Sequence, residues 1–379
     1  MGNQLRELAT AGQSVWLDNI RRSMFASGEL QKLVDVGLRG QTSNPTIFEH
    51  AIGTGTDYDE QLQGLIGSEH DAQNLFEALA IRDIRSACDV FAPVFKSTAG
   101  LDGYVSLEVS PTLAHDTKAT TAAALRLWKA VDRPNVMIKI PGTPECLASI
   151  RDSIAAGVNI NVTLLFSVDQ YAAAANAYIE GLEARVKAGQ PIGTIASVAS
   201  VFVSRIDTAI DKTLDERIAK GEKLDDLKGK AGIANLKLTY QKFEQLFHSD
   251  RFAALKANGA KVQRPLWAST STKNPKYDDL MYVVNVVGAD TVNTMPPATI
   301  DALLDHGVIK PDTIHNDVPG AKALVEALAA KGISLHDVTE QLVADGVKSF
   351  AQSFKEMLDA IEGKQKALAG ELPVKVQAK

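Results

Sequence analysis

The sequence contains few of the residues from which disulfide frameworks and metal sites are built. Only two cysteines occur in 379 residues, so neither a set of disulfides nor a cysteine-based zinc site is expected. The seven histidines show no His-x-x-x-His or His-Glu-x-x-His spacing, and the Gly-x-Ser-x-Gly turn of many serine hydrolases is absent. No Gly-x-Gly-x-x-Gly turn follows the first strand-like run, which argues against a dinucleotide-binding fold. We therefore expect neither a metal ion nor another cofactor.

Long apolar runs and a strong excess of one charge are also missing. No apolar segment is long enough to span a bilayer, and the first residues lack the apolar core of a signal peptide. The formal net charge is −6, with basic residues spread along the chain, which argues against a nucleic-acid or anionic-membrane surface. We expect a cytoplasmic protein that binds neither nucleic acid nor membranes.

Short β-rich runs alternate with helix-like stretches along most of the chain. The expected strands are residues 14–18, 37–44, 104–110, 136–140, 158–165, 197–203, 265–269 and 290–295. Such alternation is typical of βαβ units and a parallel sheet, and eight strands favour a closed (β/α)8 TIM barrel of the α/β class. We expect one barrel domain over 1–370, with a helical insertion at about 205–258 before strand seven, and a loose C-terminal tail at 371–379.

Polar residues collect where the expected strands end, which is the face of such barrels that carries active sites. The strand ends and the turns after them hold Asp18, Thr42, Asn44, Glu108, Lys139, Asn161, Thr163, Ser200, Arg205, Ser269, Ser271, Lys273 and Asn293. An inert barrel would fill its inward positions with Val, Ile and Leu. The pattern therefore predicts a pocket for a polyhydroxylated ligand.

Lys139 lies in the apolar strand Val136–Ile140. Burial in apolar surroundings disfavours the ammonium form of lysine, and a neutral amine can add to a ketone or aldehyde to form a Schiff base. The alternative is a structural lysine paired with a buried acid such as Glu108. Glu108 itself is either such a partner or a proton relay acting through water.

The other polar residues also have two interpretations each. Asp18 is either a general acid/base or a helix N-cap. Thr42, Asn44, Asn161 and Thr163 either bind sugar hydroxyls or satisfy backbone groups at strand ends.

A phosphate group is the expected ligand at one end of the pocket. Arg205 and Lys273 are candidates to bind it, with the hydroxyls of Ser269 and Ser271 and a helix N-terminus. The alternative is that both cations are simply solvated.

Six blocks of the sequence, taken in order, resemble the transaldolases. They are residues 41–47, 105–109, 138–143, 160–167, 200–205 and 267–273. The resemblance covers about residues 14–300, and its Lys-Ile-Pro-Gly-Thr block at 139–143 is highly specific. Chain length and the insertion resemble the longer bacterial subfamily.

The resemblance implies a metal-independent, class I transferase of the non-oxidative pentose phosphate pathway. Its members move a dihydroxyacetone unit reversibly from sedoheptulose 7-phosphate to glyceraldehyde 3-phosphate, giving erythrose 4-phosphate and fructose 6-phosphate. Lys139 would form the Schiff base with the donor, and Asp18 would take the proton from the C4 hydroxyl. Glu108, with Thr163, would hold a water that moves protons during dehydration of the carbinolamine.

The remaining roles concern binding of substrate. Asn44 and Asn161 would hold the dihydroxyacetone hydroxyls, with support from Ser200 and Thr42, and Arg205 matches a phosphate ligand of the family.

This sequence departs from the family pattern near the phosphate. Ser271 stands where many members carry a second Arg, so we expect Lys273, with Ser269 or Ser271, to replace it. Val201 stands where a proline is common.

Two other functions stay open at this stage. One is a fructose 6-phosphate aldolase-like activity on the same scaffold, and the other is a non-catalytic protein that binds sugar phosphates. Phosphorylated sugars are the expected ligands in each case, and we expect a monomer or homodimer.

Overall fold

Eight parallel strands form a closed barrel in the computed structural model, which describes residues 3–371. Each strand pairs with its neighbours in the sequence, and β8 closes the ring against β1. The strands are β1 (Gln13–Asp18), β2 (Gly40–Thr42), β3 (Val105–Glu108), β4 (Val136–Pro141), β5 (Ile160–Leu165), β6 (Ser197–Phe202), β7 (Arg264–Ala268) and β8 (Thr291–Met295). The predicted TIM barrel is confirmed, and each strand overlaps its predicted range.

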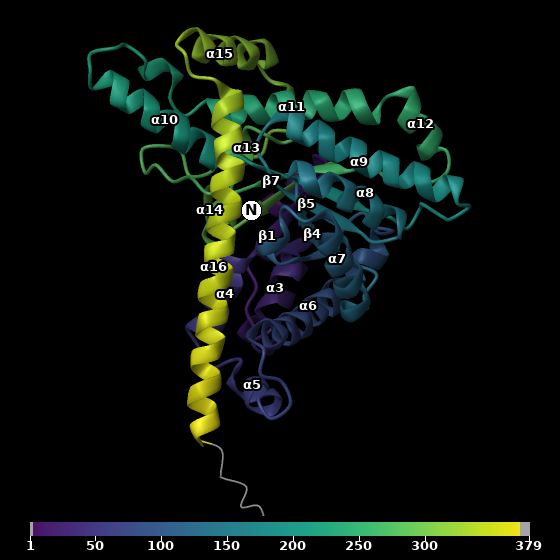
Figure 1. Cartoon of the computed structure of the whole chain (residues 1–379). Coiled ribbons are helices and arrows are strands. Elements are labelled where there is room, and N and C mark those ends of the chain that lie inside the picture. Colours follow the sequence, from purple (N-terminus) through teal and green to yellow (C-terminus); the bar gives the residue numbers. More distant parts are fainter. Residues whose placement is uncertain (1–2, 372–379) are drawn as a thin grey trace, which may run out of the picture.

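Helices surround the barrel and cover its mouth (Figure 1). They are α1 (Gln4–Thr10), α2 (Ser23–Ala26), α3 (Glu29–Val36), α4 (Pro45–Gly53), α5 (Asp59–Leu65), α6 (Ala72–Ser97), α7 (Thr117–Val131), α8 (Leu147–Ala155), α9 (Val168–Lys187), α10 (Ser204–Ile218), α11 (Ala231–Phe247), α12 (Asp250–Lys256), α13 (Met281–Val284), α14 (Pro297–His306), α15 (Val318–Ala330) and α16 (Leu335–Glu371). Short 3-10 turns are η1 (Pro111–Leu113), η2 (Pro144–Cys146), η3 (Asp225–Leu227) and η4 (Thr313–His315). None of the described helices combines the length and apolar character needed to cross a membrane.

Strand alternation divides the buried side chains into two sets. Trp16, Met137, Val198, Leu266 and Val292 belong to one cluster, which fills the inside of the barrel. Apolar neighbours along the strands, such as Val15, Leu17, Ile138, Ala199 and Trp267, belong to a second, larger cluster between the strands and the helices. Because side chains alternate between faces, the inward positions beyond this apolar layer are those that reach the barrel mouth.

The opposite end of the barrel is closed by a buried ion pair. Arg264 Nη1 lies 2.9 Å from Asp102 Oδ1, and Ser14 Oγ donates to Asp102 Oδ2 at 2.7 Å. Arg264 Nη2 also donates to the carbonyl of Thr291 at 2.7 Å. This network joins β1, β7 and β8, so the N-terminal end of the barrel is a packed structural layer.

The segment predicted as a helical insertion is helical. Residues 205–258 form most of α10, then η3, α11 and α12, and α11 packs on both α9 and α15. That barrel and insertion fold as a single domain stays a prediction. Of the predicted tail, residues 371–379, only Glu371 lies within the described residues, and α16 ends there.

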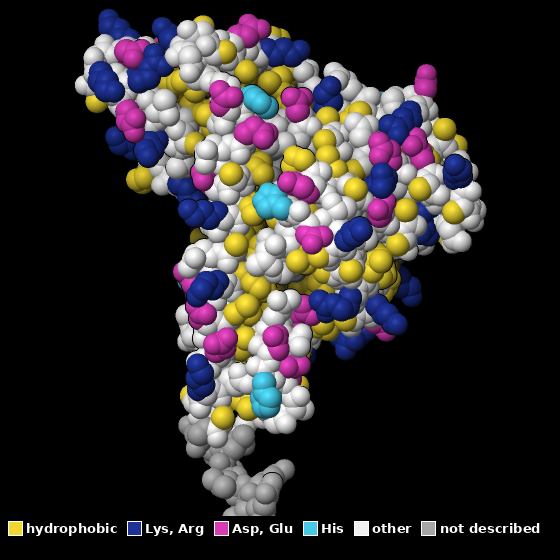
Figure 2. Space-filling model, in the orientation of Figure 1, with side chains coloured by type: hydrophobic (Ala, Val, Ile, Leu, Met, Phe, Trp, Pro, Cys, Tyr) yellow, Lys and Arg dark blue, Asp and Glu magenta, His cyan; other side chains and the backbone are white. Residues whose placement is uncertain are grey.

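The longest helix, α16, was not predicted from the sequence. It runs alongside α4 and past α5 (Figure 1, yellow). Thr46 Oγ1 donates to Ser353 Oγ at 2.9 Å, and Lys364 Nζ lies 2.6 Å from Asp59 Oδ1. These contacts anchor α16 to the helices that follow β2. On the face shown in Figure 2, acidic and basic side chains are interspersed.

We predict that Gly40→Ala destabilises the barrel. A Cβ at position 40 would lie 2.6–2.7 Å from three ring atoms of Trp16, which is fully buried inside the barrel. The ring must move, so the free energy of unfolding should fall by about 1–3 kcal/mol, the usual cost of overpacking a core. Urea denaturation measures this value.

Gly64→Ala is the matched control. Gly64 lies in α5 with no atom within 4 Å of an added Cβ, so this variant should match the wild type or gain up to about 1 kcal/mol. Equal stabilities for the two variants would contradict the packing argument.

Candidate active site

Lys139 is buried at the mouth end of β4, with only 4% of its surface exposed. Its Nζ lies 3.0 Å from Glu108 Oε2 and donates to the carbonyl oxygen of Ser43 at 3.2 Å. Glu108 is its register partner on β3. The predicted pairing with a buried acid is therefore confirmed as a contact, and a contact of this kind is compatible with either role of the lysine.

Two buried groups beside Lys139 have unused hydrogen-bonding capacity. Neither carboxylate oxygen of Glu108 has a well-aligned hydrogen-bond partner within residues 3–371, and the same holds for Thr163 Oγ1. Burial raises the pKa of Glu108, and the charge of Lys139 offsets part of that rise. Glu108 and Thr163 lie on β3 and β5, on either side of β4. The polar atoms around the lysine are thus free to bind a water or a substrate hydroxyl.

Asp18 ends β1 and is held by a threonine. Thr42 Oγ1 donates to Asp18 Oδ1 at 2.7 Å and lies 2.7 Å from Thr294 Oγ1. Burial raises the pKa of Asp18, and the charges of Lys139 and Lys273 and the Thr42 hydrogen bond lower it in part. The N-cap interpretation of Asp18 is wrong, because the next helix, α2, has Arg22 at its N-cap.

Strand eight contributes Thr294 to this pocket instead of Asn293. Val292 belongs to the inner cluster, so alternation places Thr294 inside and Asn293 outside. Asn293 Nδ2 accordingly donates to the carbonyl of Tyr282 at 3.1 Å. The expectation that Asn293 belongs to the polar set is wrong because it lies on the other face of the strand.

Amide and hydroxyl groups form a chain across β3, β5 and β6. Ser200 Oγ donates to Asn161 Oδ1 at 2.7 Å, and Asn161 Nδ2 donates to Ser106 Oγ at 2.9 Å. These bonds fix the orientation of the Asn161 amide, and Ser106 was not predicted.

The side chain of Asn44 forms a hydrogen bond with the backbone. It is the N-cap of α4, and its Oδ1 accepts from the Ile47 amide at 3.0 Å. The alternative interpretation of a strand-end residue that satisfies a backbone group is confirmed for this oxygen.

Arg205 and Lys273 lie at one end of the pocket. The Arg205 guanidinium lies over the rings of Phe202 and Phe350, 5.2 and 5.8 Å from their centroids. Burial lowers the pKa of Lys273, the charge of Arg205 lowers it further, and Asp18 opposes both effects. Lys273 is thus close enough to Arg205 and to Asp18 for their charges to shift its pKa.

Side-chain hydrogen bonds connect the residues around these cations. Lys273 Nζ donates to Ser271 Oγ at 2.6 Å, and Ser269 Oγ lies 2.9 Å from Ser204 Oγ at the start of α10. Ser269 has a φ of 57°, a left-handed conformation that is strained for a non-glycine residue and common at functional sites.

Two features that cover Lys139 were not predicted from the sequence. Leu164 has a φ of 59° at an irregularity in the β5–β6 pairing, and it joins the inner cluster. Above it lies α16, where an added Cβ on Gly346 would come within 3.0 Å of Leu164. The Phe350 ring on the same helix lies 5.8 Å from Lys139 Nζ. The local sequence does not indicate that α16 covers Lys139, because this helix begins about 40 residues after the last strand.

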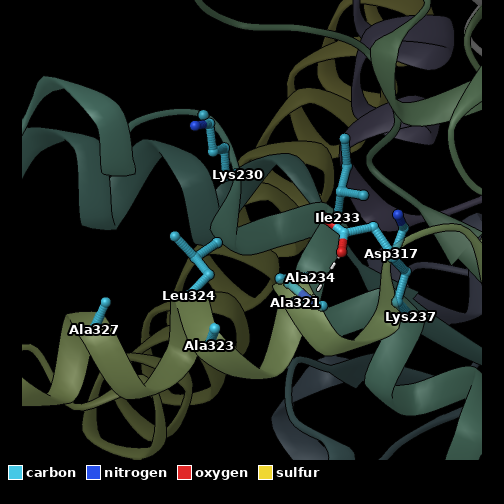
Figure 3. Close-up of a pocket in the computed structure, with 11 residues that line it drawn as sticks. Lys230, Ile233, Ala234, Lys237, Asp317, Ala321, Ala323, Leu324 and Ala327 are labelled. Atoms are coloured by element: carbon cyan, nitrogen blue, oxygen red, sulfur yellow. Dashed lines mark hydrogen bonds between the residues drawn. The ribbon is translucent and has the colours of Figure 1, made fainter.

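A hollow on the outside of the protein contains none of these residues. It lies between α11 and α15 and is lined by Lys230, Leu324 and neighbouring small side chains (Figure 3). Its volume is about 460 Å³. The polar residues at the barrel mouth include the buried Lys139 and two acids, Asp18 and Glu108, whose pKa values are raised. They are the better candidate for an active site.

Comparison with known proteins identifies the family. The model of the transaldolase/fructose-6-phosphate aldolase family matches residues 15–361. The chain belongs to this family. It is 47% identical to a transaldolase of Trichodesmium erythraeum, over 97% of this chain and 98% of that protein. It is 46% identical to transaldolase 2 of Nostoc sp., over 97% and 99%, and 47% identical to a transaldolase of Mycolicibacterium smegmatis, over 95% and 96%. The predicted family is confirmed.

We predict that Asp18→Asn changes stability in a pH-dependent way. The folded-state pKa of Asp18 is raised, mainly by burial, so ionisation of this carboxyl costs stability as the pH rises through the unfolded value near 4 and then the folded value. The asparagine variant does not ionise. Its free energy of unfolding relative to wild type should therefore increase with pH across this window, by about 1.4 kcal/mol for each unit of pKa elevation.

Urea denaturation of both proteins between about pH 4 and pH 8 measures this difference. A difference that stays constant with pH would show that burial does not raise the pKa of Asp18.

Proposed function

We propose that the chain is a transaldolase that transfers a dihydroxyacetone unit between phosphorylated sugars through a Schiff base on Lys139. The observation that carries this proposal is a buried lysine at the mouth of a barrel, flanked by two acids of raised pKa. The full-length similarity to proteins named transaldolase supports the same reaction. The donor would be sedoheptulose 7-phosphate and the acceptor glyceraldehyde 3-phosphate, in the non-oxidative pentose phosphate pathway.

Glu108 would act as the general base and general acid during Schiff-base formation. Its raised pKa and 3.0 Å contact suit it to take a proton from the Lys139 ammonium, which frees the amine to attack the ketose carbonyl. The resulting carbinolamine loses its hydroxyl as water when a proton is returned. Thr163 Oγ1, buried and without a partner among the described residues, would hold the water that carries this proton.

Asp18 would then act at the bond that breaks. It would accept the proton of the C4 hydroxyl, the C3–C4 bond would break, and the aldose product would leave. The electron pair stays on the lysine-bound three-carbon unit, which adds to the aldehyde of the acceptor while Asp18 returns the proton. The hydrogen bond from Thr42 at 2.7 Å orients this carboxylate for both steps.

Hydroxyls of the bound unit would be held by oriented polar groups. Asn161 is fixed by Ser200 and Ser106, and Asn44 and Thr42 lie at the end of β2. The substrate phosphate would bind Arg205 and Lys273, with Ser269, Ser271 and the N-terminus of α10. Leu164 and Phe350 would exclude water from the carbanion, which favours transfer over release.

A cytoplasmic location and a monomeric or homodimeric state stay predictions.

Borohydride trapping tests the lysine. With fructose 6-phosphate and borohydride, the wild type should gain a reduced three- or six-carbon adduct that maps to Lys139 by peptide mass, because only an imine is reduced to a stable amine. Lys139→Ala should form no adduct. Lys261→Ala is the matched control. Lys261 is partly buried and, like Lys139, donates to a backbone carbonyl, that of Gly100, at 2.9 Å. The Lys261→Ala variant should still form the adduct at Lys139.

Other results would favour the other two functions. Tight binding of fructose 6-phosphate without an adduct would favour the non-catalytic binder. Rapid, sustained release of free dihydroxyacetone from fructose 6-phosphate alone would favour an aldolase.

We predict that Asp18→Ala separates the two chemical stages. The adduct should still form because Lys139 and Glu108 are intact, while turnover with fructose 6-phosphate and erythrose 4-phosphate should fall about 10²- to 10⁴-fold, the usual contribution of a general acid/base. Trapping and coupled-assay turnover on the same preparation measure both quantities. Loss of adduct and turnover together would mean that Asp18 is structural.

A further inference from the structure

Two aspartates on successive turns of α10 are buried, and neither contacts a Lys or Arg side chain in the described part of the chain. Asp207 and Asp211 are 2% and 8% exposed, and neither has a salt-bridge partner within residues 3–371. Burial raises the pKa of Asp207 to about 6. Burying carboxylates without cations is costly unless their oxygens are hydrogen-bonded, so their partners reveal what they hold in place.

All four carboxylate oxygens accept a hydrogen bond. Asp207 accepts from the Gly232 amide at 2.8 Å and from Tyr282 Oη at 2.7 Å. Asp211 accepts from the Gly229 amide at 2.9 Å and from Tyr277 Oη at 2.6 Å. We call Asp207, Asp211, Tyr277 and Tyr282 the aspartate–tyrosine clamp.

The clamp joins three segments that are distant in the sequence. The aspartates belong to α10 and the two glycines lie around the start of α11, both within the insertion, and the tyrosines belong to the segment after β7. The fit is close: a Cβ on Gly229 would lie 2.7 Å from the Tyr277 ring, and one on Gly232 would lie 2.9 Å from Asp207 Oδ2. Glycine is therefore required where the insertion meets the clamp.

The loop that carries Ser271 and Lys273 is held to α10 at both ends. At its start, Ser269 Oγ lies 2.9 Å from Ser204 Oγ. At its end, Tyr277 donates to Asp211. Arg205 lies in the first turn of the same helix, so the position of Lys273 relative to Arg205 depends on these two attachments.

We propose that the aspartate–tyrosine clamp positions Lys273 against Arg205 for binding of the substrate phosphate, and that the insertion braces this arrangement. The proposal rests on the proposed function, in which these two cations bind the phosphate. The clamp residues act through Lys273 and are positioning residues. Their loss should weaken binding of the phosphate group and leave the chemistry at Lys139 largely unchanged.

Tyr277→Phe tests this proposal with two acceptors at saturating sedoheptulose 7-phosphate, which releases erythrose 4-phosphate with either acceptor. The KM for glyceraldehyde 3-phosphate should rise roughly tenfold, because a displaced Lys273 would lose its charge-assisted hydrogen bond to the phosphate, while kcat changes little. The KM for glyceraldehyde, which lacks the phosphate, should stay close to the wild-type value. Gly229→Ala, which displaces the Tyr277 ring, should give the same selective rise.

Tyr178→Phe is the matched control. It removes another buried tyrosine hydrogen bond, to the carbonyl of Lys261 at 2.8 Å, and should change neither KM. A Tyr277→Phe effect that is equal for both acceptors, or absent, would overturn the clamp proposal.

Arg205→Met distinguishes this failure from failure of the proposed phosphate site. It should raise the KM for glyceraldehyde 3-phosphate selectively. If it does not, the phosphate ligands are assigned wrongly and the clamp proposal is overturned with them, whereas trapping at Lys139 reports on the proposed reaction independently. If Arg205→Met is selective and both clamp variants are not, the clamp proposal alone is wrong.

Discussion

The contact between Lys139 and Glu108 is the constraint on which the rest of the site depends. A buried ion pair gains less from attraction than it loses in desolvation unless other bonds satisfy it, and here both oxygens of Glu108 remain without aligned partners in the described chain. Such a pair adds little to stability. It is better explained by chemistry, because an acid of raised pKa beside a lysine can exchange a proton with it at little cost.

A helix that is distant in the sequence helps to bury that pair. A barrel mouth is open by construction, since its strands end there. Leu164, turned inward by the irregularity in β5, and Phe350 on α16 supply the apolar cover. Gly346 lets the helix approach Leu164 closely, because an added Cβ would lie 3.0 Å from that side chain. The environment of Lys139 on β4 is thus completed by residues near the other end of the described chain.

The features that could be predicted are those that local sequence patterns encode. Alternation located the eight strands, and the polar strand ends located Lys139, Glu108, Asp18 and Asn161. The error at Asn293 arose because membership of a strand does not by itself state which face a residue occupies, and the inward position of Val292 decides it. The cover by α16 and the bend at Leu164 depend on tertiary contacts, which no local pattern encodes.

The two ends of the pocket are built on different physical supports. Lys139, Glu108 and Asn161 lie in hydrogen-bonded register on adjacent strands, so the barrel itself fixes their separation. Arg205 and Lys273 lie outside the strands, and their separation depends on side-chain bonds such as Ser204–Ser269 and Asp211–Tyr277. Rigid strands suit the bond-breaking step, whose geometry tolerates little change. A phosphate can be bound by many arrangements of cations and hydroxyls, so the proposed phosphate site would tolerate a lysine such as Lys273 on a loop held by side-chain bonds.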